Sequence, residues 1–99
     1  MRIRFERTGG FAGIPMRVTI DSATLPPEEV QKLADLVDAA HFFQLPPVVP
    51  ASTRGADRFH YKLTVETEDR QHTIELGEAG ATAAMEPLLE WLMDAARKR

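Results

Sequence analysis

The stretch FHYKLTVE, residues 59–66, decides the fold, because apolar and polar side chains alternate through all of it. A period of two predicts a strand with one buried face. A polar turn at residues 68–71 follows, after which Ile74 and Leu76 return to the buried face. We therefore expect a hairpin in which Val65 lies opposite Ile74 and Leu63 opposite Leu76, a register that keeps both apolar rows on one side.

A second hairpin is predicted at the start of the chain. Residues 1–6 alternate between apolar and polar side chains, and so do residues 14–21. Between these two runs, the glycine-rich segment at residues 9–13 supplies a turn. Pro15 has no amide N–H to donate, so the strand that begins there is expected at an edge of the sheet.

Two amphipathic helices follow the hairpins. The run Pro26-Pro27-Glu28-Glu29 is typical of a helix start, because proline is tolerated in the first turn and carboxylates interact favourably with the helix dipole there. An apolar stripe at three- and four-residue spacing occupies residues 30–40, and Pro46-Pro47 indicates that this helix ends near residues 41–44. A similar stripe at residues 85–96 predicts the last helix.

These elements predict an α+β fold in a single domain over residues 1–99, with the order ββαββα. Only one face of each strand is apolar, so a four-stranded antiparallel sheet should carry both helices on that face. If each element runs back against the one before it, the first helix ends where the first hairpin turns. The connections at residues 9–13, 46–57 and 77–84 then gather at one end of the sheet, and the turn at 68–71 lies at the other.

Composition narrows the range of functions. The chain is 43% hydrophobic and 27% charged, an ordinary globular balance, and it has no cysteine, which excludes disulfides and thiol chemistry. The net charge of −3 disfavours bulk attraction to nucleic acid or anionic lipid. No apolar stretch is long enough to span a bilayer, and the chain begins with an alternating pattern instead of a secretory signal. We therefore expect a cytoplasmic protein that binds no membrane.

Catalytic and metal chemistry find little support in the sequence. His41, His60 and His72 are the histidines, and the predicted register puts His60 and His72 on different faces, so capping or exposed roles are favoured over a metal site. Neither Ser22 nor Ser52 lies in a glycine-flanked nucleophile elbow. We expect no enzyme, no cofactor and no metal.

The outward face of the sheet raises the alternative of nucleic-acid binding. Arg2, Arg4, Arg17 and Lys62 fall on this face, interrupted by acidic side chains. Sheet modules that bind single-stranded RNA stack bases on outward aromatic rings, whereas the aromatic residues of these strands fall inward. A mixed, solvated face is therefore favoured over a nucleic-acid site.

Binding of a partner protein through loops remains. Phe11 stands among glycines at a hairpin tip, either as an exposed anchor for a partner or folded back over the sheet. Val48 and Val49, framed by prolines, form a stiffened apolar segment that is either a docking surface or a lid over the core. The candidate partner-binding residues are Gly9, Gly10, Phe11, Ala12, Gly13, Pro47, Val48, Val49 and Pro50.

The same segments resemble the emfourin family. The resemblance rests on RIRFERTGGFAGI at residues 2–14, LPPEE at 25–29, Phe42-Phe43 before Leu45-Pro46, GADRF at 55–59 with Tyr61, HTIEL at 72–76 and Pro87-Leu88-Leu89. It implies a bacterial inhibitor of protealysin and other thermolysin-like zinc proteases, whose active-site cleft would be filled by a rigid wedge of surface loops. The zinc would then belong to the protease. The alternative is a non-catalytic protein- or nucleic-acid-binding module of the bacterial cytoplasm.

Overall fold

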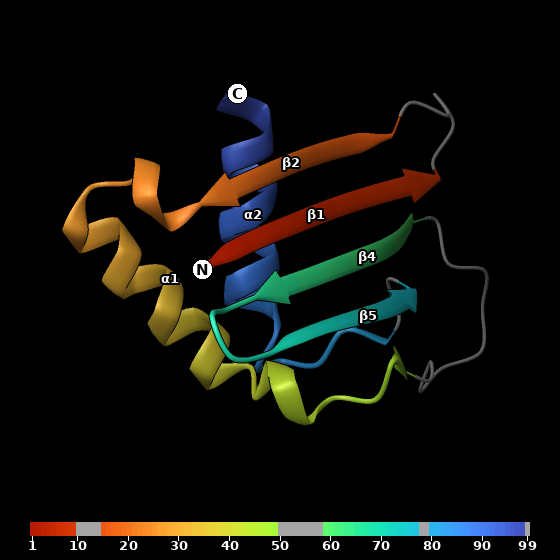
Figure 1. Cartoon of the computed structure of the whole chain (residues 1–99). Helices are drawn as coiled ribbons and strands as arrows, with labels where there is room; N and C mark the ends of the chain where they lie inside the picture. The colour runs from red at the N-terminus through yellow and green to blue at the C-terminus, as the bar shows by residue number, and fades with distance from the viewer. Residues whose placement is uncertain (10–14, 50–58, 78–79, 99) are drawn as a thin grey trace.

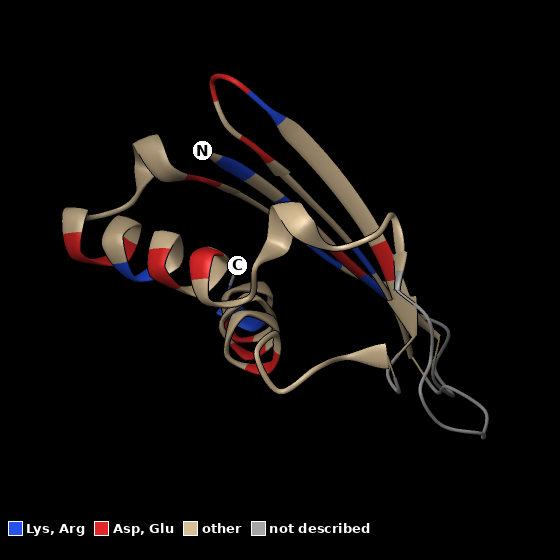
Figure 2. Cartoon of the chain, turned by 90° about the horizontal axis from the view of Figure 1, so that it is seen from below, with Lys and Arg blue, Asp and Glu red and all other residues tan. Residues whose placement is uncertain are grey.

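The structure, a computed structural model, describes residues 1–9, 15–49, 59–77 and 80–98 and has two layers. One layer is a sheet in the spatial order β2-β1-β4-β5-β3, and the other holds two helices on one face of that sheet (Figures 1 and 2). The elements in chain order are β1 (Arg2–Gly9), β2 (Met16–Asp21), η1 (Ser22–Thr24), α1 (Pro27–Ala39), η2 (Phe42–Gln44), β3 (Val48–Val49), β4 (Phe59–Glu66), β5 (Gln71–Gly77) and α2 (Glu86–Lys98).

Four strands and two helices in the order ββαββα confirm the predicted α+β fold. β1 pairs antiparallel with both β2 and β4, and β4 pairs antiparallel with β5. β2 is an edge strand, and Pro15 lies exposed immediately before it, as the missing amide N–H of proline requires. Within the described ranges, no helix has the length and apolar content needed to cross a membrane.

One core fills the space between sheet and helices. Most inward side chains of the three central strands β1, β4 and β5 are almost completely covered, and α2 contributes more fully buried leucines than α1 does. The fully buried large side chains are Phe5, Phe42, Ile3, Ile20, Leu33, Leu63, Ile74, Leu76, Met85, Leu88, Leu92 and Val65. These inward positions agree with the alternation and the helical stripes of the sequence.

The second hairpin differs from its predicted register by two residues. Leu63 pairs with Ile74 and Val65 with His72, so the predicted pairs Val65–Ile74 and Leu63–Leu76 are wrong. The reason is a tighter turn than expected, since the Thr67 amide donates to the Arg70 carbonyl oxygen at 2.8 Å. A shift of two residues keeps every side chain on its predicted face, and it places His72, on the inner face as predicted, opposite Val65.

The segment at residues 46–57, predicted as a loop, contains a fifth strand among its described residues. β3 pairs parallel with β5, with Val48 opposite Glu75 and Val49 opposite Leu76. The pairing begins one residue earlier, where the Glu75 amide donates to the Pro47 carbonyl oxygen at 2.8 Å. The loop prediction is therefore wrong for Val48 and Val49. Two residues are too few for a strand pattern to be recognised in a sequence, and this strand forms only by pairing with the distant β5.

The first helix ends earlier than residues 41–44. α1 stops at Ala39, Ala40 closes it, and His41 follows with φ 51° and ψ 42°, in the left-handed region. A left-handed residue directly after a helix satisfies the last carbonyl groups, and here it reverses the chain into η2. Glycine usually occupies this position, because a Cβ atom in the left-handed region is sterically unfavourable.

His41→Gly should therefore stabilise the domain by about 1 kcal/mol. The backbone conformation would be kept, and the steric cost of the Cβ atom would disappear. The free energy of unfolding from urea titration measures the effect. His41→Ala serves as the control, because it removes the imidazole but keeps the Cβ atom, and it should bring no gain. An equal gain in both variants would assign the effect to the imidazole ring instead of the backbone.

Candidate functional site

The described ends of three connections meet at one end of the sheet, which we call the rim. The rim is formed by Gly9 at the end of β1, Met16 at the start of β2, Val49, Phe59 and Gly77 (Figure 1). The pairing places Gly9 opposite Phe59 and His60 opposite Gly77. The sequence-based expectation that these connections share one end therefore agrees at these five residues, but not at the start of the 46–57 segment.

The path of the chain into the rim differs from the expected one. The first helix was expected to end at the rim, but α1 ends near the opposite end of the sheet, where Phe43 of η2 packs under Arg70 of the β4–β5 turn. The guanidinium carbon of Arg70 lies 3.8 Å from the centre of the Phe43 ring. From η2 the chain runs back beside β5 and reaches the rim at β3 (Figure 1). The expectation failed because α1 crosses the direction of the strands at an angle instead of running antiparallel to β2 (Figure 1).

The candidate residues fall into described and undescribed groups. Gly9 ends β1 with φ 97°, a conformation that favours glycine. Pro47 is exposed. Val48 has 66% of its surface exposed, and among the described residues it is the large apolar side chain that faces solvent. Val49 is placed as part of β3. The remaining candidates, Gly10, Phe11, Ala12, Gly13 and Pro50, lie outside the described residues.

The guanidinium group of Arg7 packs beneath the rim on the inner face of the sheet, and the sequence-based prediction did not include this residue. Arg7 continues the inward phase of β1 beyond Phe5, and its guanidinium carbon lies 4.3 Å from the centre of the Phe59 ring. The Nη1 group of Arg7 donates to the Sδ atom of Met93 on α2 at 3.5 Å. Arg7 thereby closes the core at the rim and links the sheet to the helix layer. The signal was present, because Arg7 follows Ile3 and Phe5 at a spacing of two, one residue past the predicted strand at residues 1–6.

His72 anchors the strand that carries Val48. Its Nε2 atom donates to the Leu45 carbonyl oxygen at 2.6 Å, because a carbonyl oxygen can only accept. The ring also packs edge-on against Phe42, with 5.5 Å between ring centres, and lies 6.5 Å from Phe43. These contacts hold the chain just before β3 against β5. His72 therefore positions the exposed edge without being part of it.

His72→Ala should lower the free energy of unfolding by about 1–3 kcal/mol, since the Leu45 carbonyl loses its donor in a partly buried place. Amide exchange at Glu75, which donates to Pro47, should accelerate more than exchange elsewhere in β5. His60→Ala is the matched control, because its side chain is half exposed on the outer face and paired with Glu75 at 3.4 Å. Unchanged protection of the Glu75 amide in His72→Ala would contradict the anchoring role.

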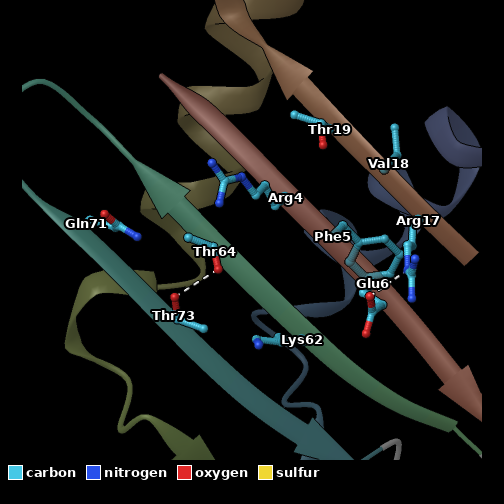
Figure 3. A pocket seen from close by; sticks show the side chains of 10 residues that line it. All are labelled: Arg4, Phe5, Glu6, Arg17, Val18, Thr19, Lys62, Thr64, Gln71 and Thr73. Atoms are coloured by element: carbon cyan, nitrogen blue, oxygen red, sulfur yellow. Dashed lines mark hydrogen bonds and ion pairs between the residues drawn. The ribbon is translucent and has the colours of Figure 1, made fainter.

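The outer face of the sheet carries a shallow depression lined by described residues. It has a volume of about 420 Å³ and is open to solvent (Figure 3). Its main lining side chains are Arg4, Glu6, Arg17, Lys62, Thr64 and Thr73. Arg17 is paired with Glu6 at 2.7 Å, and the Thr64 and Thr73 hydroxyl groups are 2.8 Å apart. The two hydroxyl groups bond to each other, and this arrangement gives neither of them a basic side chain that would activate it as a nucleophile.

Other functional chemistries are also unsupported by the described part of the chain. The aromatic residues Phe5 and Tyr61 are buried and Phe59 is half-buried on the inner face, so the outer face lacks stacking platforms for bases. The acidic side chains of α1 are exposed along that helix (Figure 2). Among residues the structure describes, no three histidine, aspartate or glutamate side chains group closely enough to hold a metal.

Comparison with known proteins adds a family to this geometry. The family model described as Emfourin matches residues 5–93 of the chain. The match covers β1 from Phe5 onward, α2 as far as Met93 and every element between them, including the five residues of the rim. The comparisons with curated proteins and with solved structures found no match.

Proposed function

Because the chain belongs to the emfourin family, we propose that it is a protein inhibitor of thermolysin-like zinc proteases of the protealysin type. The family match carries the proposal, since it supports a protease-inhibitor-like role over nearly the whole chain. The finer elements are ours: the class of target, the rim as the contact surface, and a bacterial cytoplasmic location. The zinc is the protease's own, and the inhibitor needs no cofactor.

The exposed part of β3 supports the choice of the rim. Val48 exposes 66% of its surface although it lies on a paired strand, so its backbone is held while its side chain is available. Pro46 and Pro47 fix φ in the approach to this strand. A segment that is ordered before binding loses little conformational entropy when a partner covers it. Such a segment fits an apolar pocket in a deep cleft.

Resistance to cleavage would follow from the same arrangement. A protease must bring its substrate backbone into an extended, reactive position beside the catalytic zinc. The β3 backbone is already engaged, because Glu75 donates to Pro47 and Val49 pairs opposite Leu76. Productive cleavage would require these hydrogen bonds to break, and the anchoring of Leu45 by His72 opposes that. The inhibitor would occupy the cleft and leave it uncut.

Peptide hydrolysis by a purified thermolysin-like enzyme tests the proposal. The chain should slow hydrolysis of a fluorogenic peptide at sub-micromolar concentration, and mass spectrometry after incubation should recover the chain intact. Unchanged hydrolysis by several such enzymes at high micromolar concentrations would contradict it. Fluorescence anisotropy with single-stranded oligonucleotides separates the alternative, since binding with a steep salt dependence would favour a nucleic-acid module.

A further inference from the structure

β2 is an open edge of the sheet over its full length. It is hydrogen-bonded to β1 on one side, and no described element pairs with it on the other. The Ser22 amide donates to the Met1 carbonyl oxygen at 2.9 Å, which fixes the phase of the ladder. Since backbone groups alternate in direction along an antiparallel strand, the N–H and C=O groups of Arg17, Thr19 and Asp21 point away from β1. The Asp21 carbonyl oxygen also accepts from the Thr24 hydroxyl group at 2.8 Å and keeps one lone pair for a second donor.

The two edges of the sheet are protected very differently. The opposite edge, β3, has two residues and follows Pro46 and Pro47, which is how natural proteins limit edge pairing. β2 has six residues, and Pro15 lies just outside it. A long, unprotected edge is a template for another strand, so the question is which strand fits it.

We propose that β2 pairs antiparallel with β2 of a second copy of this chain, with Thr19 opposite Thr19 of the second copy. In this register all three outward-facing residues of each copy find outward-facing partners, and each pair exchanges two backbone hydrogen bonds. Arg17 then lies opposite Asp21 of the second copy, and Asp21 lies opposite Arg17. Neighbouring symmetric registers place Arg17 against Arg17, Asp21 against Asp21 or Asp21 against Pro15, which has no N–H.

The side chains on both faces support this register. Arg17 and Asp21 expose 69% and 42% of their side chains and already pair with Glu6 and Arg2 within one copy. The second copy would join these pairs into a row of alternating charge across the joint. On the inner face, Val18 would lie opposite Ile20 of the second copy; both are already buried in the single chain, so the charged pairs carry the specificity of the joint. The end of α2 reaches past β2 in the helix layer and would contact the second copy there (Figure 1).

The dimer would leave the proposed inhibitory surface free. The rim lies at the Met16 end of β2, and antiparallel pairing puts the two Met16 ends at opposite ends of the joint. If the rim binds the protease, as in the proposed function, one dimer should bind two protease molecules. The dimer itself depends only on β2, so its failure and the failure of inhibition are measured separately.

A charge-swap experiment followed by sedimentation velocity tests the pairing. The natural chain should pass from monomer to dimer between micromolar and millimolar concentrations. Arg17→Glu and Asp21→Arg should each weaken the dimer roughly tenfold or more, because both symmetric contacts become repulsive. An equimolar mixture of the two variants should restore the dimer, since every contact across the joint is then attractive. Arg4→Glu, a matched charge reversal on β1, should leave the dimer intact.

Thr19→Pro covers the case in which a charge variant folds poorly. The Thr19 amide faces the open side, so proline removes no hydrogen bond to β1 and should still abolish the dimer. Circular dichroism confirms that each variant is folded. A natural chain that stays monomeric at millimolar concentration would overturn the proposal, and so would a mixture that restores nothing, or dimers equally weakened by Arg4→Glu.

Discussion

Val48→Asp should weaken inhibition of a thermolysin-like protease by roughly 100-fold, the scale of a central interface residue. The change puts a carboxylate where we propose an apolar contact, and burying an unpaired charge is costly. Stability should stay within about 0.5 kcal/mol of the natural chain, because Val48 exposes 66% of its surface and its backbone pairing with β5 is kept. The inhibition constant and a urea titration give the two numbers.

The control for this substitution is Ala34→Asp on the exposed side of α1. It adds the same charge to the same molecule away from the rim, so it should change the inhibition constant by less than about twofold. Equal losses in both variants would show that overall charge and not the rim governs binding. An unchanged inhibition constant in Val48→Asp would remove β3 from the inhibitory surface and leave the first hairpin turn as the remaining candidate.

Patterns of period two and of three to four residues were sufficient to predict the layers of this fold. They fail where two arrangements bury the same faces. The predicted and observed registers of the β4–β5 hairpin differ by two residues, and both keep Leu63, Val65 and Ile74 inside. The choice between them was made by the hydrogen bond from Thr67 to Arg70, which depends on turn geometry that hydrophobic alternation does not encode.

The exposure of Val48 could be anticipated from the sequence, whereas the strand that holds it could not. Prolines around two valines drew attention to Val48, and its exposure agrees with a docking surface more than with a lid. The strand that holds it depends on His72, which is 27 residues away from its partner Leu45 in sequence. Such a contact leaves no local signature. Arg7 could have been found, because its inward phase follows directly from the alternation of β1.

Phe5→Ala should cost about 3–5 kcal/mol of stability, the largest loss expected from any substitution discussed for this chain. Phe5 is 2% exposed on β1, between β2 and β4, and its ring lies 6.0 Å from that of Tyr61. Alanine would leave a cavity that neighbouring strands cannot close, since both are hydrogen-bonded to β1. Domains of this kind have about 5–15 kcal/mol in total, so the urea midpoint should fall severely. Arg4→Ala, the exposed neighbour, should change little.

The comparison of Phe5→Ala with Val48→Asp separates folding from binding. Well below its melting temperature, the folded fraction of Phe5→Ala keeps its rim and should still inhibit with an affinity close to that of the natural chain. Val48→Asp should remain fully folded and inhibit poorly. Inhibition assays at 10 °C, with folded fractions measured by circular dichroism, give both values. If Phe5→Ala lost more inhibition than its unfolded fraction explains, the shape of the rim would depend on the core beneath β1. The rigid-wedge mechanism would then need β1 itself as a contact.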